Sequence, residues 1–160
     1  MVNAYIGIGS NLSEPLQQVR AAIASLKKIP DSHVSRVSSF YRSKPLGQPD
    51  QPDFINAVAS VNTALDPHEL LDYLQAIEQQ QGRLRDGVRW GPRTIDLDML
   101  LFGDIALRTD DLQIPHPGLV EREFVLYPLA EIAPDLVLPD GTTVRTLRAR
   151  CSSRGIMVEL

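Results

Sequence analysis

The sequence predicts one α+β domain built on an antiparallel sheet, and three observations lead to this fold class. The chain has 160 residues with no break in composition, which fits the roughly 100–200 residues of a single domain. Its 43% hydrophobic and 22% charged residues are typical of globular proteins. Alternating apolar and polar stretches are interleaved with stretches of helical spacing, in the order strand, helix, strand, strand, helix, strand. We therefore treat residues 1–160 as one domain.

The first strand is expected at residues 2–9, and it runs into a glycine-containing turn over residues 7–11. A helix follows from about Ser13, the candidate N-cap, with Pro15 in its first turn, and Pro30 marks its end. Its apolar residues recur at steps of three and four, which places them on one face of the helix: Leu16, Val19, Ile23 and Leu26.

Two strands are expected next. Residues 33–42 are predicted to form one strand, with Val37, Ser39 and Tyr41 on the same face. The proline-containing loop 44–53 is longer than most connections, which suggests a functional role. The strand at 54–63 is predicted to be half-buried, with an apolar face made of Ile55, Ala57, Ala59 and Val61.

The second helix should begin at Asp66, because an N-cap residue, a proline and an acid three positions after the cap form a start signal. It should end at Gly82, with inward-facing Leu70, Leu74 and Ile77. An arginine-rich loop at 83–93 then leads into a strand at 94–102, whose apolar face consists of Ile95, Leu97, Met99 and Leu101.

This order of elements is the ferredoxin-like arrangement, an antiparallel sheet with two helices on one face. We expect the remaining elements to be appended to that core. They are a short strand pair near 104–114, a helix through about 121–132 that is bent or started at Pro128, a turn at 139–141 and a closing helix near 143–150.

The composition excludes several classes of function. Sixteen Lys and Arg against 20 Asp and Glu give a net charge of −4, the wrong sign for a protein held to nucleic acid by its net charge. Cys151 is the single cysteine, which excludes an internal disulfide and a multi-cysteine zinc site. The chain shows neither a bilayer-spanning apolar run nor a secretory signal. We expect a cytoplasmic monomer without a nucleic-acid or membrane partner.

Asp96 and Asp98 point to the same side of their predicted strand, with Cα atoms roughly 7 Å apart. Two carboxylates so placed can hold Mg²⁺, whose other positions are filled by water and substrate phosphates. The alternative is a solvent-facing strand that carries acids on its polar face. Leu100 and Phe102 are expected on the same face, which indicates that this side is covered and that the acids there need cations.

Four arginines gather within residues 83–93, where Asp86 is the single acid, so this segment carries +3 and the rest of the chain −7. Arginine presents a planar fork of donors suited to phosphate oxygens. Beside Mg²⁺-binding acids, such a loop provides the components of phosphoryl transfer. The alternative is a solvated charge run. No Walker motif is present, and we interpret Gly7 and Gly9 as residues that permit close backbone packing.

Three further residues could contact a flat substrate. Phe54 and Asn56 lie two positions apart on one strand face, and Phe124 begins a late helix. Two aromatic rings can sandwich a heterocycle while an amide hydrogen-bonds to its edge. The alternative is that both rings belong to the core. His116, between two prolines, could contact phosphate or fill a turn, and Trp90 could anchor the core or close over a bound ring.

Four ordered segments together resemble the 6-hydroxymethyl-7,8-dihydropterin pyrophosphokinase family of folate biosynthesis, with a match from Tyr5 to about Asp140. They are residues 40–47 (FYRSKPLG), 51–58 (QPDFINAV), 89–98 (RWGPRTIDLD) and 115–117 (PHP). The resemblance implies a ferredoxin-like enzyme that moves the β,γ-pyrophosphoryl group of ATP to the pterin hydroxymethyl oxygen. It also implies release of AMP and a requirement for two Mg²⁺ ions.

The resemblance also implies roles for individual residues. Asp96 and Asp98 would hold Mg²⁺, and Arg83 and Arg93 would be catalytic groups that neutralise the triphosphate. The nucleotide would be bound by Gln75, Glu78, Arg85, Arg89, Trp90, Met99, His116 and Arg122. The pterin would lie between Phe54 and Phe124, close to Trp90, with its edge bound by Asn56 and by the backbone near Ser43 and Leu46.

The arginine-rich loop is expected to act as a lid. Gly82, Gly87 and Gly91 give it hinge freedom, and closure would bring its arginines onto the triphosphate. Two non-catalytic alternatives share the same core: a small-molecule sensor and an RNA-binding sheet. An RNA-binding sheet should carry aromatic residues and positive charge on its open face, whereas Asp96 and Asp98 lie there.

Overall fold

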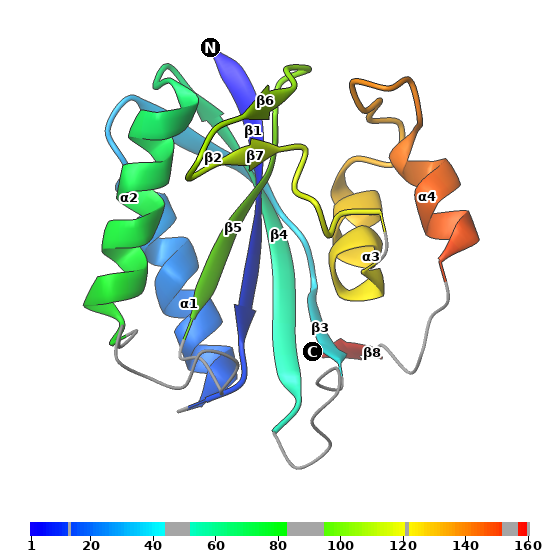
Figure 1. Cartoon of the computed structure of the whole chain (residues 1–160). Helices are drawn as coiled ribbons and strands as arrows, with labels where there is room; N and C mark the ends of the chain where they lie inside the picture. The colour runs from blue at the N-terminus through cyan, green and yellow to red at the C-terminus, as the bar shows by residue number, and fades with distance from the viewer. Residues whose placement is uncertain (13, 44–51, 83–94, 121, 152–156, 160) are drawn as a thin grey trace.

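The computed structural model describes residues 1–12, 14–43, 52–82, 95–120, 122–151 and 157–159. They form three layers, which Figure 1 shows side by side. Helices α1 (Pro15–Leu26) and α2 (Pro67–Gln80) cover one face of a sheet, and helices α3 (Glu123–Ile132) and α4 (Val144–Arg150) lie against the other. Each face of the sheet therefore has its own hydrophobic core.

Six described strands form the sheet. They are β1 (Val2–Ser10), β2 (Ser32–Val37), β3 (Phe40–Ser43), β4 (Phe54–Thr63), β5 (Asp96–Phe102) and β8 (Met157–Glu159). The order is β5-β1-β4-β3-β8, β2 also pairs with β4, and all pairs are antiparallel. This order confirms the predicted ferredoxin-like α+β core.

The first strand continues through the glycines. β1 extends to Ser10, and Gly7 and Gly9 pair with residues of both β4 and β5. The expected turn over residues 7–11 was therefore wrong for residues 7–10, which belong to the strand. Two partner strands hydrogen-bond this stretch, and that tertiary pairing overrides the local preference of glycine for turns.

The predicted single strand at 33–42 is two strands, β2 and β3, and the chain between them has one residue more than the facing stretch of β4. Val37 pairs with Ala59 and Tyr41 with Asn56, so four positions along β2 and β3 face three positions along β4. Ser38 makes this break possible, because its Oγ accepts from the Val58 N–H at 2.9 Å in place of a backbone carbonyl. Val37 consequently faces the α1/α2 core and Tyr41 faces α3, contrary to the expected shared face.

Strand β4 was predicted to be half-buried and is buried on both faces. Its apolar residues face α1, as expected, but Asn56 and Ser60 on the other side are only 6% and 5% exposed. The reason is that α3 packs along β4 from the second face. A strand covered on both sides shows no solvent-facing alternation.

A bulge in β5 changes its faces near the end. The pairing shifts between Tyr5 and Ile6, so Leu100 and Leu101 both belong to the α3/α4 core, whereas Phe102 packs in the α1/α2 core. The expected position of Leu101 with Leu97, and of Phe102 with the two aspartates, was therefore wrong. The expectation for Leu100 is confirmed: it lies on the aspartate face and is covered.

The helices follow their sequence signals closely. Asp66 caps α2 through a reciprocal capping box with Glu69, and Gly82 after the helix has a φ of 89°. α1 starts at Pro15 after Glu14, while Ser13, its candidate N-cap, lies outside the described residues. The expected strand pair is β6 (Leu107–Arg108) with β7 (Gln113–Ile114), and α3 and α4 fall within the expected ranges. No helix in the described part of the chain has the length and apolar character to span a bilayer.

Candidate active site

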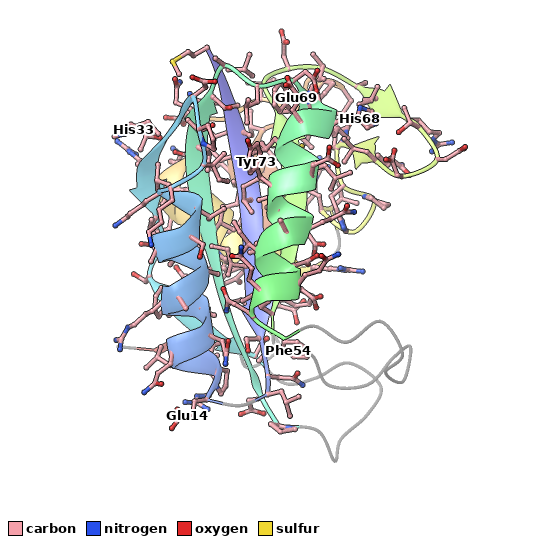
Figure 2. The ribbon with its side chains drawn as sticks, turned by 90° about the vertical axis from the view of Figure 1, so that its left-hand side faces the viewer. Glu14, His33, Phe54, His68, Glu69 and Tyr73 are labelled. Carbon is pink, nitrogen blue, oxygen red and sulfur yellow. The ribbon has the colours of Figure 1, made fainter. Side chains whose placement is uncertain are left out.

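Several of the predicted site residues lie on the α3 side of the sheet, where β4 and β5 begin. The register places Asp96 beside Gly9, Gly9 beside Asn56, and Asn56 beside Tyr41, in one row across four strands. Figure 2 shows Phe54, the first residue of β4, at the end of the molecule opposite His33 and His68. Sheet pairing thus brings together residues from four separate segments of the sequence.

Asp96 and Asp98 share this face and are both partly exposed. Leu97 between them is only 5% exposed and packs in the opposite core, which fixes the alternation. The Asp98 side chain is 47% exposed. A pair of carboxylates on one strand face with access to solvent is an arrangement that Mg²⁺ accepts.

His116 lies next to Asp98. Its Nε2 is 3.9 Å from Asp98 Oδ1, and its side chain is 22% exposed. Two hydrogen bonds place it: its backbone N–H donates to the Leu100 carbonyl at 3.0 Å, and its Nδ1 accepts from the Gly118 N–H at 3.0 Å. Because Nδ1 is the acceptor, the neutral ring carries its proton on Nε2, toward Asp98.

Burial lowers the pKa of His116 below its usual value. Asp98 acts in the opposite direction, and the neighbouring Arg122 lowers the pKa further. The ring is therefore neutral at neutral pH. It presents an Nε2–H donor, which suits an oxygen of a bound anion.

Arg122 brings a guanidinium to the same region. Its side chain crosses directly over Gly118, where a Cβ atom would lie 2.5 Å from Arg122 Nε. Its Cζ is 5.8 Å from the centre of the Phe124 ring. The turn from His116 to Phe124 therefore groups an imidazole donor, a guanidinium and a partly exposed aromatic ring.

Asn56 and Ser43 form a buried polar pair at the other end of the row. Asn56 Nδ2 donates to Ser43 Oγ at 2.7 Å, and the two residues are 6% and 5% exposed. Asn56 Oδ1 lies over Gly9, where a Cβ atom would be 3.0 Å away. Phe54 next to this pair is partly exposed, and Phe124 lies on α3, the helix that packs along β4. A flat heterocycle could be bound here by its edge and its faces.

The donor set fits Mg²⁺ better than a metal that needs a full protein cage. The described residues contain no group of three or more His, Cys, Asp or Glu side chains able to hold a metal ion. Mg²⁺ is commonly bound by one or two carboxylates, with water and phosphate oxygens as its remaining ligands. Asp96 and Asp98 fit that pattern.

Three residues expected at the nucleotide lie elsewhere or serve the core. Gln75 is exposed on α2. Met99 is 3% exposed and packs in the α1/α2 core, on the face opposite Asp96 and Asp98. Glu78 is buried, and its Oε2 accepts from the Leu97 N–H at 2.8 Å. Their predicted contacts with a nucleotide stay predictions.

Part of the predicted site lies outside the described residues. This part comprises Leu46, Arg83, Arg85, Arg89, Trp90 and Arg93, together with the expected lid at 83–93. The described half contains the carboxylate pair, His116, Arg122 and the Asn56–Ser43 pair.

Sequence reasoning missed the roles of two glycines. Gly9 lies between Asp96 and Asn56 in the row and leaves room for the Asn56 amide. The Gly118 N–H fixes the ring of His116. The Gly-x-Gly pattern in β1 was a sequence signal for the role of Gly9. We expected close backbone packing from this pattern but did not connect that packing with a site. No sequence signal marked the second, because it depends on the fold of one turn.

Comparison with known proteins identifies the family of this chain. A family model described as 7,8-dihydro-6-hydroxymethylpterin-pyrophosphokinase matches residues 5–134. A Pseudomonas aeruginosa protein named 2-amino-4-hydroxy-6-hydroxymethyldihydropteridine pyrophosphokinase is 52% identical over 152 residues, which cover 95% of this chain and 93% of that protein. A Haemophilus influenzae protein of the same name is 50% identical over 147 residues, which cover 92% and 91%.

Solved structures support the fold. A structure described as HPPK-DHPS in complex with substrates superposes with a TM-score of 0.72 at 14% identity, over 94% of this chain and 45% of that longer chain. The chain thus spans less than half of that protein, and the likeness concerns the fold alone. The family match and the extent of the curated relatives show that this chain belongs to the 7,8-dihydro-6-hydroxymethylpterin-pyrophosphokinase family of transferases.

Proposed function

We propose that this protein transfers the β,γ-pyrophosphoryl group of ATP to the hydroxymethyl oxygen of 6-hydroxymethyl-7,8-dihydropterin. The hydroxymethyl oxygen attacks the β-phosphorus, the bond from that phosphorus to the oxygen bridging to the α-phosphate breaks, and AMP leaves. The hydroxyl proton is lost. One observation supports this proposal above all: Asp96, Asp98 and His116 lie at the same end of one sheet face as the buried Asn56–Ser43 pair. The chain that carries this grouping belongs to the pyrophosphokinase family.

Asp96 and Asp98 would hold two Mg²⁺ ions, which neutralise phosphate charge as it shifts toward the leaving group. The two carboxylates lie on the same face at the start of β5, two positions apart. The buried Leu97 keeps them from rotating out of that face. Rigid placement matters, because phosphoryl transfer depends chiefly on positioning and charge neutralisation.

His116 and Arg122 would bind phosphate oxygens beside the metal ligands. The neutral imidazole donates from Nε2, and the guanidinium adds a charged, planar donor set. Arg83 and Arg93 would complete the charge neutralisation from the arginine-rich loop, with Arg85, Arg89 and Trp90 contributing to nucleotide binding. That part of the proposal rests on the resemblance of the RWGPRTIDLD segment to the family.

The Asn56–Ser43 pair would select the pterin. A fused heterocycle has hydrogen-bonding groups along one edge, and a buried amide held at 2.7 Å by a hydroxyl is a preorganised partner for such an edge. Phe54 and Phe124 would supply the flat contacts above and below. Since a buried polar group is costly when unpaired, this site would discriminate against compounds that lack the matching edge.

Product analysis with single-component omissions tests the proposal. We expect ATP, Mg²⁺ and 6-hydroxymethyl-7,8-dihydropterin together to give AMP and a pterin diphosphate ester, and no AMP when the pterin or Mg²⁺ is left out. Formation of ADP would mean attack at the γ-phosphorus, as in an ordinary kinase. Pterin binding without turnover would favour the non-catalytic sensor. Either result would overturn the proposal.

A further inference from the structure

Glu78 is a buried carboxylate in an unfavourable place on α2. It is only 7% exposed and lies on the inward-facing stripe with Leu70, Leu74 and Ile77. Removing a carboxylate from water costs free energy unless it is hydrogen-bonded. Glu78 also lies in the last turn of α2, where the helix dipole disfavours negative charge, and that turn carries no basic residue. Such a residue needs a compensating interaction.

The edge of β5 supplies one such interaction. Among the described strands β5 pairs only with β1, so alternate N–H groups point away from the sheet. One of them, the Leu97 N–H, donates to Glu78 Oε2 at 2.8 Å in a buried setting. A buried backbone N–H needs an acceptor, and a charged acceptor makes the stronger bond. This bond thus offsets part of the cost of burying each partner.

This bond lies between the two metal-ligand candidates. The Leu97 N–H belongs to the peptide unit that joins Asp96 to Leu97, and Asp98 follows directly. Farther along the same edge, the Leu100 carbonyl accepts from the His116 N–H at 3.0 Å. The free edge of β5 is therefore fastened on both sides of Asp98, by Glu78 and by the backbone of His116.

We propose that Glu78 is a positioning residue that holds Asp96 and Asp98 at their spacing for metal binding. The role rests on the function proposed above. Glu78 acts from the α2 side of the strand through the backbone, and this role requires no contact with the nucleotide. The resemblance had implied that Glu78 lines the nucleotide pocket, whereas the anchoring bond gives it a different task in the same reaction.

Two variants separate these tasks. Glu78→Gln keeps an acceptor oxygen at the same distance from the backbone, and Glu78→Met keeps the length of the side chain but removes the acceptor. We expect Glu78→Met to raise the Mg²⁺ concentration for half-maximal activity at least about 10-fold, the usual scale for residues that support metal ligands. Glu78→Gln should stay within about 3-fold of the wild type, and the KM for pterin should be unchanged in both.

A readout without catalysis accompanies the kinetics. Mn²⁺ binding in the presence of a non-hydrolysable ATP analogue, followed by electron paramagnetic resonance, should weaken by about 10-fold or more in Glu78→Met and little in Glu78→Gln. Amide exchange at Leu97, measured by NMR, should be slow in the wild type and in Glu78→Gln. If Glu78→Met does not fold, amide exchange in the wild type and in Glu78→Gln still tests the bond between Glu78 and the Leu97 N–H.

Three outcomes would overturn the inference. One is an unchanged Mn²⁺ affinity in folded Glu78→Met. Another is fast exchange of the Leu97 amide in the wild type. The third is a large rise in the KM for ATP in Glu78→Gln with an unchanged Mg²⁺ requirement, which would make Glu78 a direct nucleotide contact. Failure of the wild type to make AMP would instead refute the proposed function, and the exchange experiment would still report on the anchor.

Discussion

At the residue scale, the proposed reaction depends on Asp96 and Asp98. Both lie partly exposed on one face of β5, and no described cluster of three or more side chains offers another metal site. Asp96→Ala or Asp98→Ala should remove about 3–4 kcal/mol of transition-state stabilisation, a rate loss of several hundred-fold, because a ligand is lost where charge develops. The measurement is single-turnover rate at saturating Mg²⁺, with circular dichroism as the control for folding. A near-normal rate in either variant would refute the metal assignment.

The imidazole of His116 makes a second prediction at this scale. The Gly118 N–H occupies Nδ1, so Nε2–H is left for the anion. Glutamine can place an amide N–H near the position of Nε2, whereas asparagine reaches only the position of Nδ1. We expect His116→Gln to bind ATP about 3- to 10-fold more tightly than His116→Asn, a difference of roughly one hydrogen bond. Calorimetric titration with ATP checks this, and equal affinities would show that Nε2 is not the donor.

At the scale of elements, β1 lies between the carboxylate pair on β5 and Asn56 on β4. Gly9 on this strand has no side chain, which leaves room for the Asn56 amide. A Cβ atom there would lie 3.0 Å from Asn56 Oδ1, whereas one at Gly7 would meet the Leu100 side chain at an ordinary 3.4 Å. Gly9→Ala should therefore displace the amide and raise the KM for pterin about 5-fold or more, on the scale of one weakened hydrogen bond. Gly7→Ala is the matched control and should leave that KM within 2-fold. The same rise in both variants would contradict the spacing argument.

Helix α3 is fastened to strand β3 and to Ser39, which precedes that strand, by a carboxylate. Glu131 accepts from the Tyr41 hydroxyl at 2.6 Å and from the Ser39 N–H and hydroxyl. Tyr41→Phe removes one charged hydrogen bond and should lower the free energy of unfolding by about 1.5–3 kcal/mol. Urea unfolding at neutral pH measures this. An unchanged midpoint would show that the bond contributes no net stability.

The same contact makes stability depend on pH. Burial raises the pKa of Tyr41, and its hydrogen bond to Glu131 raises it further. Since the folded pKa lies above the unfolded value of about 10, this stabilisation is complete below that pH and declines as the pH rises through it. Between about pH 9.5 and 11, the wild type should lose more stability than Tyr41→Phe. Parallel losses in the two proteins would contradict the contribution of Tyr41.

The elements differ in how far the sequence alone predicts them. The capping box of α2 was predictable, because it depends on four consecutive residues, 66–69. The aspartate pair was predictable for the same reason, since alternation along one strand places both side chains. The bulges in β2–β3 and β5 were not, because they follow from the register with a partner strand. The burial of Asn56 was likewise hidden, because α3, which covers it, comes more than sixty residues later.

At the scale of the whole molecule, the fold places the candidate binding residues for both proposed substrates at one end of one sheet face. The candidate metal ligands Asp96 and Asp98 lie on β5, and the candidate phosphate-binding residues lie on the turn that fastens its edge. The Asn56–Ser43 pair lies two strands away, on β4 and β3. This order across the sheet predicts a triphosphate bound over β5 and a pterin bound over β4, with Gly9 between them. Because the β,γ-pyrophosphoryl group is the group proposed to be transferred, the β-phosphorus, and not the γ-phosphorus, must then face the pterin oxygen.

Labelled ATP shows which phosphorus of the nucleotide is attacked. The protein is incubated with Mg²⁺, 6-hydroxymethyl-7,8-dihydropterin and ATP carrying distinguishable labels on its β- and γ-phosphates, and the products are separated. We expect both labels in equal amounts on the pterin product and neither on the released nucleotide, which is AMP. A pterin product that carries the γ-label alone, with the β-label retained on ADP, would contradict this expectation.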